Sequence, residues 1–455
     1  MAVVAAIGGI LFGYDTAVIS GTTAIVKNQF ALTDMMEGWY VGCALIGSIC
    51  GVLVAGTLSD YLGRKLTMLI SAALFSISAI GCAVCGSFDA LVAYRIIGGI
   101  GIGIVSIVSP IYISEVSPAR IRGTLVSLYQ LAVTVGFLLA YLANWVIDMN
   151  IDNSLTFGDP ALSLWERIMN TEAWRGMLGS ETLPALLFFF IIFFIPESPK
   201  WLIVNGKLDK ASLVLSKIYA TQEEVKEEIE VTNASLKGET KGKWSDLLKP
   251  GILIAVIAGS AIAILGQFMG VNAVLYYGPK IFADAGFENP MFSTVLVGVV
   301  NCVTTILAVF IIDRVGRKQL IYWGVSGMII SLVAIGIYFA WGSQIGLGNG
   351  FMLTFFLAYV FCTAISICAV VFVLLSEMYP NSVRGRAMSI AGFALWIGTY
   401  LIGQLTPVLL GWSQAGTFFL FAIMCVPYML IMWKVIPETT GKTLEEIEAY
   451  WTNKK

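Results

Sequence analysis

The sequence contains no histidine, and only 12% of its residues are charged. Histidine is the side chain that titrates closest to neutral pH, so its absence removes the commonest general base and a frequent metal ligand. Soluble domains carry about 25% charged residues, roughly twice the fraction found here. A net charge of −2 also lacks the basic excess that favours nucleic acid. We therefore expect a membrane protein without cofactor, metal site, enzymatic activity or nucleic-acid partner.

Two short motifs resemble nucleotide-binding sequences but do not meet the requirements of such sites. GIGIG at 99–103 lies inside an apolar run, where closely spaced glycines let helices pack together. GKT at 441–443 would need a glycine at position 436 to form a phosphate-binding loop, and that residue is Ile436. Because no ATP site is visible, any uphill transport must use an ion gradient.

Twelve apolar runs are long enough to cross a bilayer as helices. They cover residues 3–26, 39–59, 66–87, 91–113, 124–147, 177–195, 252–277, 291–312, 320–340, 351–375, 387–411 and 416–436. The polar stretch after the sixth run includes 207–236, which has the spacing of short amphipathic helices. The pattern predicts an all-α membrane protein with twelve transmembrane helices. We divide it into an N-terminal six-helix bundle at 1–195, an intracellular helical segment at 196–250, a C-terminal six-helix bundle at 251–436 and a cytoplasmic tail at 437–455.

Basic residues are concentrated in the short even-numbered loops. These loops carry Arg64, Lys65, Arg120, Arg122, Arg314, Arg317, Lys318, Arg384 and Arg386. The first loop and the seventh-to-eighth loop, on the opposite face, carry Lys27 and Lys280. By the positive-inside rule, the even-numbered loops and both termini are cytoplasmic. We predict a multi-pass protein of the inner, or plasma, membrane.

Three charged motifs occur twice, at equivalent loops of the two halves. They are SDYLGRK at 59–65 and IDRVGRK at 312–318, SEVSPARIRG at 114–123 and SEMYPNSVRG at 376–385, and PESPKWL at 196–202 and PETTGKTL at 437–444. This repetition predicts two six-helix bundles related by an axis along the membrane normal.

These motifs, together with LFGYDTAVISGT in the first run and RIIGGIGIG in the fourth, resemble the sugar porter family of the major facilitator superfamily. The resemblance covers essentially the whole chain and looks closest to the bacterial proton-coupled xylose symporters. It implies the major facilitator fold, with import of a monosaccharide and a proton by alternating access. We expect a pentose such as xylose, or a hexose, as substrate, and a monomer in the lipid bilayer.

Two other functions are compatible with this resemblance. A facilitative sugar or polyol uniporter would share the fold and the sugar site without using a proton gradient. A non-transporting sensor would bind sugar and signal through the polar segment 197–250. The ionisable residues inside the apolar runs distinguish a symporter from both.

Asp15 lies in the middle of the first run, where a charge costs roughly 2.5–3.5 kcal/mol to insert and therefore needs a partner. At a rise of 1.5 Å per residue, Asp15 lies about 16 Å below the outer end of its run and Arg95 about 6 Å below the outer end of its own. The difference in depth is about 10 Å, which is near the combined reach of an arginine and an aspartate side chain. Movement of the arginine away from Asp15, or loss of water from around the carboxylate, would convert Asp15 from ionised to protonated. The resemblance assigns this proton-coupling role to Asp15, Arg95 and Glu181. A static buried ion pair is the alternative.

A sugar site needs hydrogen-bonding side chains and an aromatic ring at mid-membrane depth. The resemblance assigns substrate contact to Gln130, Gln267, Asn272, Asn301 and Trp396, and an outer-gate position to Tyr276. Gly266 and Gly270 flank Gln267, so we expect the seventh run to unwind there. Interhelical hydrogen bonding, worth about 0.6 kcal/mol on average, is the alternative role of these polar groups.

The chain departs from the family pattern at three places in its second half. Gly266 replaces the first of two glutamines, and Leu395 replaces a glutamine of close relatives. CAVVF at 368–372 replaces a glycine–proline motif followed by tryptophan, which removes a hinge from the tenth run. The identity of the sugar therefore does not follow from the resemblance, because specificity depends on such polar contacts.

Carboxylates and arginines together form a candidate cytoplasmic latch at the even-numbered loops. Its members are Asp60, Arg64, Glu115, Arg122, Glu197, Asp313, Arg317, Glu377, Arg384 and Glu438. We expect contacts between Glu115 and Arg122 and between Glu377 and Arg384. Exposed pairs contribute only about 0–1 kcal/mol each, which suits a latch that must open. Topology signals at solvated helix ends are the alternative.

Overall fold

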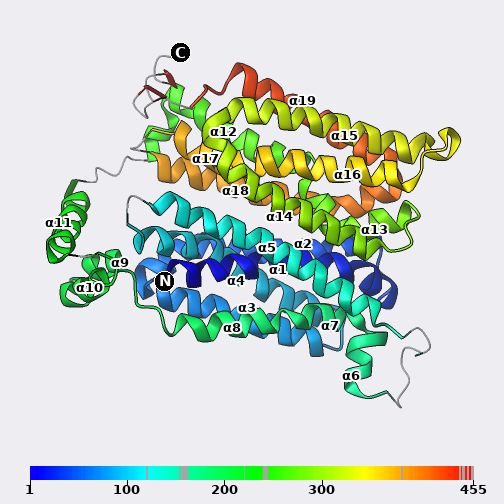
Figure 1. The fold of residues 1–455 in the computed structure, drawn as a ribbon, viewed down its shortest axis with the longest axis horizontal. Helices are drawn as coiled ribbons and strands as arrows, with labels where there is room; N and C mark the ends of the chain where they lie inside the picture. The colour runs from blue at the N-terminus through cyan, green and yellow to red at the C-terminus, as the bar shows by residue number, and fades with distance from the viewer. Residues whose placement is uncertain are drawn as a thin grey trace. The chain divides into compact units, whose positions relative to one another are not determined.

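The computed structural model describes residues 1–118, 121–152, 155, 162–219, 221–238, 244–380, 383–439, 442, 446–447 and 450–451. Over these residues the regular structure is helical, without a β-strand (Figure 1). Twelve helical segments among them are long and apolar enough to cross a membrane. The prediction of an all-α membrane protein with twelve transmembrane helices is confirmed.

The sixth of the first six membrane-spanning segments is made of two helices. The segments are α1 (Ala2–Gln29), α2 (Asp34–Leu62), α3 (Arg64–Val84), α4 (Phe88–Glu115), α5 (Arg122–Met149), and α7 (Ala173–Ser180) with α8 (Thr182–Ile192). Two short helices, α6 (Leu164–Glu166) and the π-helical η2 (Arg167–Thr171), precede α7. Glu181 therefore occupies the junction between α7 and α8.

The second set of six segments contains two interrupted helices, the seventh and the tenth. The segments are α12 (Pro250–Phe268) with α13 (Val271–Asp284), α14 (Pro290–Val315), α15 (Arg317–Ile345), α16 (Asn349–Thr363) with the π-helical η4 (Ala364–Cys368) and α17 (Ala369–Met378), α18 (Arg384–Trp412) and α19 (Gln414–Lys434). Both interruptions fall in segments to which the sequence assigns substrate binding or altered motifs.

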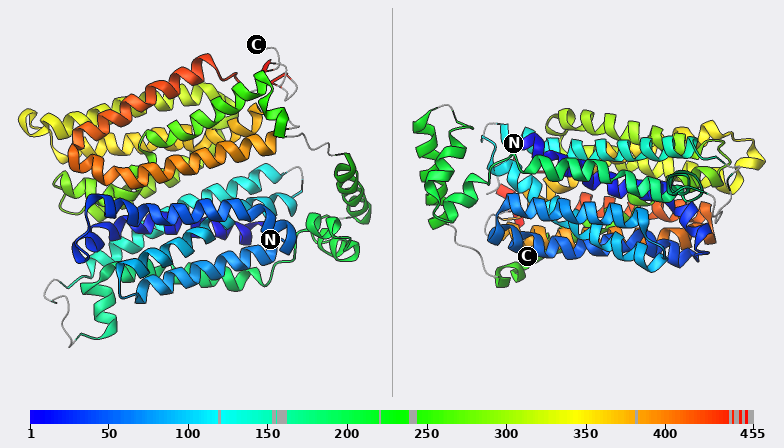
Figure 2. Two further views of the ribbon diagram at one scale, coloured as in Figure 1. Left: turned by 180° about the vertical axis from the view of Figure 1, so that it is seen from behind. Right: turned by 90° about the horizontal axis from the view of Figure 1, so that it is seen from below.

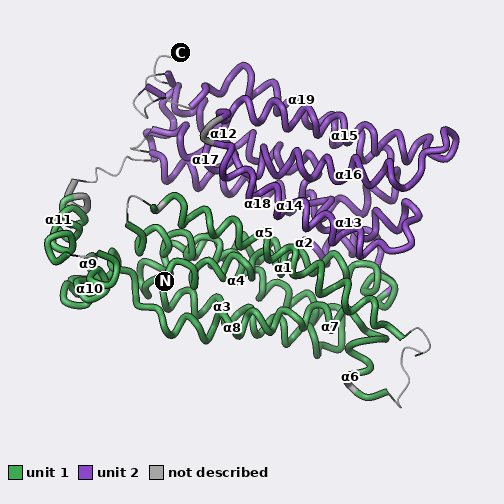
Figure 3. The backbone as a smooth tube through the Cα atoms, in the orientation of Figure 1, with its two compact units in different colours: residues 1–30, 43–239 green, residues 31–42, 240–455 purple. Residues whose placement is uncertain are grey.

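The chain forms two compact units, coloured separately in Figure 3. The first contains residues 1–30 and 43–239, and the second contains residues 31–42 and 240–455. Helix α2 contributes to both, because its residues up to Gly42 pack with the second unit and the remainder with the first. The finer division into bundles, intracellular segment and tail stays a prediction.

Close packing of α1 and α5 depends on glycines. A Cβ atom on Gly13 would overlap the backbone of Val133, and one on Gly136 would overlap the backbone of Ile10. Helices that lack these side chains can approach until their backbones touch, as small residues allow in membranes. This contact fixes α1, the helix that carries Asp15, against its neighbour.

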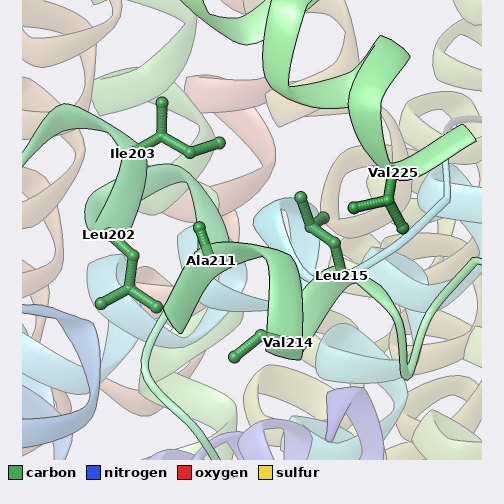
Figure 4. Packing of buried hydrophobic residues seen from close by; sticks show 6 residues of the cluster. All are labelled: Leu202, Ile203, Ala211, Val214, Leu215 and Val225. Atoms are coloured by element: carbon green, nitrogen blue, oxygen red, sulfur yellow. The ribbon is translucent and has the colours of Figure 1, made fainter. Parts of the chain in front are cut away.

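The polar segment folds as short helices, as its amphipathic spacing predicts. These are α9 (Pro199–Val204), α10 (Leu208–Leu215), α11 (Gln222–Gly238) and the 3₁₀ helix η3 (Trp244–Leu248). Helices α9, α10 and α11 lie together beyond the ends of the first unit's long helices (Figures 1 and 2). They share a small apolar core of Leu202, Ile203, Ala211, Val214, Leu215 and Val225 (Figure 4).

Candidate functional site

A buried ion pair joins α1 to α4 in the interior of the first unit. Arg95 donates from Nη1 to Oδ1 of Asp15 at 2.7 Å, and the two side chains are 3% and 2% exposed. Glu181, at the junction of α7 and α8, is also buried, and its carboxylate lies within electrostatic range of both groups. The structure thus brings together the three residues that the resemblance assigns to proton coupling.

The charges in this cluster do not balance, since two carboxylates face one guanidinium. Asp15 Oδ2 and Glu181 Oε1 are buried and lack a hydrogen-bond partner among the described residues. An ionised carboxylate is expensive to bury without full compensation and binds a proton instead. The cluster therefore contains two buried carboxylate oxygens that no hydrogen bond among the described residues satisfies.

The sequence did not indicate the polar groups that surround this cluster. The hydroxyls of Tyr14 and Ser180 are 2.7 Å apart and tie the residue before Asp15 to the residue before Glu181. On the other side, Gly98 of α4 leaves space for Ser78, and a Cβ on this glycine would lie 3.8 Å from Asp15 Oδ1. Neither contact has a sequence signal, because serine and tyrosine are common in membrane helices and no motif marks them.

In the second unit, the seventh segment breaks between α12 and α13. Gly270 adopts φ +90°, in the left-handed region that favours glycine, and it is the N-cap of α13. Across this break, Asn272 Nδ2 donates to Gln267 Oε1 at 2.6 Å. The predicted unwinding is confirmed at Gly270, whereas Gly266 remains inside α12.

The other residues assigned to the sugar site occupy varied surroundings. Tyr276 on α13 and Asn301 on α14 are buried, and Trp396 on α18 is half-buried. Gln130, on α5 of the first unit, is exposed. The structure joins Gln267 directly to Asn272; a substrate role for all six residues stays a prediction.

The tenth segment widens into a π-helical turn at Ala364–Cys368. The sequence led us to expect that loss of the glycine–proline motif removes a hinge, and that expectation stays a prediction. A π-turn places an extra residue in one helical turn, which disturbs the regular hydrogen-bond ladder without proline. The tenth segment is therefore irregular in the turn that ends at Cys368, the first residue of the altered motif.

In the first unit, the latch residues form one cluster at the ends of α2, α3 and α4. Arg64 binds Glu115 through Nε and Nη2 at 3.0 and 3.1 Å, and also binds Asp60 at 3.0 Å. The backbone amides of Arg64 and Lys65 donate to Glu197 at 2.9 and 3.1 Å. The expected pairing of Glu115 with Arg122 involves a side chain outside the described ones.

The second unit repeats this cluster at the ends of α14, α15 and α17. Arg317 binds Glu377 at 3.0 Å, and the amide of Lys318 donates to Glu438 at 3.2 Å. The hydroxyls of Ser198 and Thr439 make equivalent hydrogen bonds, to Glu115 at 2.5 Å and to Glu377 at 2.6 Å. The sequence repeat is therefore a repeat of hydrogen bonds.

The partner expected for Glu377 differs from the observed one. Arg384 donates from Nε and Nη2 to the carbonyl of Tyr379, each at 3.3 Å, while Glu377 is held by Arg317. Arg384 is only a few residues from Tyr379 in the chain, so a local carbonyl is within reach and Arg317 supplies the cation. The side chain of Asp313, another predicted member, lies outside the described ones.

Comparison with known proteins identifies the family to which the chain belongs. The family model for "Sugar (and other) transporter" matches residues 1–451. The chain belongs to this family. Its relatives include the arabinose-proton symporter of Bacillus subtilis, 38% identical over 450 residues that cover 98% of this chain and 93% of the relative. The D-xylose-proton symporter of Escherichia coli is 38% identical over 483 residues, which cover 98% of this chain and 94% of the relative.

Solved structures of this sugar transporter family share the fold. The xylose transporter XylE from E. coli, in its inward-open conformation, matches with a TM-score of 0.85 and 35% sequence identity over 99% of both chains. A second XylE structure, described as a major facilitator superfamily proton:xylose symporter bound to 6-bromo-6-deoxy-D-glucose, matches with a TM-score of 0.79 and 36% identity, covering 99% of this chain and 98% of that one. The predicted major facilitator fold is confirmed.

Proposed function

We propose that this protein is a proton-coupled symporter that imports a monosaccharide, a pentose such as xylose or arabinose or a hexose. The observation that carries the proposal is the buried cluster of Asp15, Arg95 and Glu181, in which two carboxylates face one guanidinium. Relatives named as arabinose-proton and D-xylose-proton symporters, each 38% identical, support the same assignment. The protein acts as a monomer and catalyses no reaction.

Proton coupling follows because Arg95 and a proton compete for the carboxylate of Asp15. While the carboxylate is ionised, Arg95 holds it at 2.7 Å. A proton that binds at Asp15 Oδ2 removes the charge that attracts Arg95, so the arginine can leave and α1 and α4 can move relative to each other. When the site rehydrates on the other side of the membrane, the proton leaves and the pair forms again.

Sugar binding uses the broken seventh segment. Gln267 and Asn272 face each other across the break at Gly270 and together offer donors and an acceptor beyond the hydrogen bond that joins them. Sugar hydroxyls need both kinds of partner. Ligand-dependent movement of α13, which carries Tyr276 one turn after Asn272, would close the site.

The two latch clusters orient the transporter and bias its conformation. We place both termini, the segment 196–250 and the clusters around Arg64 and Arg317 in the cytoplasm of a cell whose plasma membrane the protein spans. Within each unit the cluster holds the ends of neighbouring helices together. Release of these contacts accompanies opening toward the cytoplasm.

The proposal is tested with Asp15→Asn, which keeps the shape of the side chain and removes its titratable proton. Reconstituted wild-type protein should accumulate D-xylose, L-arabinose or D-glucose when an inward proton gradient is applied. The variant should still bind and exchange that sugar but should not accumulate it. Wild-type uptake that only equilibrates the sugar and does not respond to the proton gradient would mean that the protein is a uniporter. An Asp15→Asn variant that still accumulates sugar would show that Asp15 does not couple the proton.

A further inference from the structure

We infer that Gly398 on α18 is a specificity-determining residue, because it sets the position of the Gln267 side chain. The inference rests on the proposed sugar site and adds a residue that makes no hydrogen bond to a ligand. Gly398 is buried and lies in the middle of a helix. Glycine there costs about 1 kcal/mol relative to alanine, so its presence points to a packing requirement.

The requirement is the close approach of Gln267. A Cβ atom on Gly398 would lie 3.1 Å from Cβ and 3.2 Å from Cγ of Gln267, and 3.0 Å from Cγ1 of Ile264. Carbon atoms in favourable contact are separated by about 3.5–4.0 Å. The stem of Gln267 therefore rests on a surface that exists only because residue 398 has no side chain.

The head of the same side chain is fixed by α13. Asn272 Nδ2 donates to Gln267 Oε1 at 2.6 Å, which leaves Gln267 Nε2 and Asn272 Oδ1 without a further side-chain hydrogen bond among the described residues. Gln267 is thus positioned from two sides, by α18 at its stem and by Asn272 at its amide. These two contacts fix the direction of the two N–H groups on Gln267 Nε2, which are the donors available to a sugar.

A methyl group at position 398 must displace the stem of Gln267 by a few tenths of an ångström, and we expect the amide at its end to move with it. A site that selects hydroxyls by hydrogen bonding loses both affinity and discrimination when a donor moves out of line. Loss of one hydrogen bond raises the dissociation constant about 3- to 10-fold. The change should fall most on sugars whose hydroxyl contacts Gln267, so relative affinities within a sugar panel should change as well.

The test is a double-mutant cycle in purified full-length protein, with D-xylose, L-arabinose and D-glucose as probes. Gly398→Ala should weaken binding of the preferred probe about 3- to 10-fold and alter the order of preference. In the Gln267→Ala background, the same substitution should change affinity less than about 2-fold, because the amide through which it acts on the sugar is gone.

Two further variants serve as controls, one for the added methyl group and one for the contact with Ile264. Gly392→Ala places a methyl group on the same helix where no atom lies within 4 Å, and it should leave affinity and selectivity unchanged. Gly398→Ala combined with Ile264→Ala removes the second close contact, so an affinity loss that persists there supports the role of Gln267. Thermal unfolding of each variant confirms that the protein is folded.

The outcomes separate this inference from the proposed function. Equal weakening by Gly398→Ala in both backgrounds would show that it acts independently of Gln267, which overturns the inference and leaves the sugar site standing. Unchanged affinity and preference in Gly398→Ala would also overturn it. If Gln267→Ala itself binds every probe normally, or if the wild type binds none, the proposed sugar site fails and the inference fails with it.

Discussion

At the scale of single residues, two glycines have conformations that other residues avoid. Gly63 has φ 96° and ψ 163°, and Gly316 has φ 98° and ψ 149°. Each stands directly before an arginine of the repeated GRK sequence and is the N-cap of a membrane-spanning helix. This backbone region is essentially restricted to glycine. The repeated motif thus encodes a turn as well as charges.

Replacement of Gly63 by alanine should therefore destabilise the protein by about 1–3 kcal/mol or more, because a side chain is costly in that backbone region and the added Cβ would also overlap the carboxylate of Glu197. Gly56→Ala, on α2 with no atom near the added methyl group, is the matched control and should not lower stability. Thermal unfolding in detergent measures both. Equal midpoints for Gly63→Ala and the wild type would show that the turn relaxes without cost.

Asn272 carries a second residue-scale prediction. Asn272→Ala removes one potential ligand partner and leaves Gln267 Oε1 without its donor, so sugar affinity should fall by about 1–3 kcal/mol. Asn150→Ala, an exposed asparagine that bonds Val146 at the end of α5, should bind sugar normally. Isothermal titration calorimetry measures the sugar affinity of each variant. If Asn272→Ala binds every tested sugar as tightly as the wild type does, Asn272 is not part of the sugar site.

At the scale of helices, the start of α2 is bound to α13 by an ion pair and to α18 by a hydrogen bond. Lys280 Nζ lies 2.9 Å from both carboxylate oxygens of Glu37, whose side chain is fully buried. Gln404 donates to the carbonyl of Met35 at 2.9 Å. These contacts explain why residues 31–42 pack with the second unit although the rest of α2 packs with the first.

Removal of one member of this buried pair should be costly. Lys280→Met takes the ammonium group away from a buried carboxylate and should destabilise the protein by about 3–5 kcal/mol, whereas Glu37→Gln combined with Lys280→Met should recover much of that loss. The exposed pair Lys249–Asp246 serves as control, since Lys249→Met should cost less than about 1 kcal/mol. Chemical denaturation in detergent compares them, and a double variant no more stable than Lys280→Met would contradict this account.

At the scale of the whole molecule, each unit carries its own copy of the latch. Arg64–Glu115 and Arg317–Glu377 are the guanidinium–carboxylate pairs, and each carboxylate also accepts a hydroxyl hydrogen bond. The expectation that these pairs are exposed is wrong. The side chains of Arg64 and Glu115 are 11% and 8% exposed, and those of Arg317 and Glu377 are 12% and 24% exposed, so removing either arginine leaves a largely buried carboxylate without its charge partner.

Weakening both copies should shift the conformational equilibrium of the transporter toward the state open to the cytoplasm. Arg64→Ala with Arg317→Ala should increase maleimide labelling, from the cytoplasmic side, of a cysteine introduced at the exposed position Gln130. Lys249→Met again provides a control that leaves the latch intact. Transport is measured in the same arginine variant with Gln130 retained. Wild-type labelling together with wild-type transport would show that the arginines serve topology alone.

The sequence by itself determined the features that depend on local composition. The twelve spans follow from hydrophobic length, the two halves from repeated motifs, and the break in the seventh segment from its glycines. Hydrophobicity acts on each segment separately, so these features need no knowledge of neighbours. The helices of 199–238 were likewise predictable from their amphipathic spacing.

Only the tertiary structure decided which polar groups meet. Glu377 pairs with Arg317 rather than with Arg384, and Gln267 rests on Gly398, 131 positions further along the chain. The π-turn at Ala364–Cys368 and the attachment of the start of α2 to α13 also have no local signal. These features depend on helices distant in sequence that approach within a few ångströms, and side-chain partners are selected by that packing because an unpaired buried group is costly.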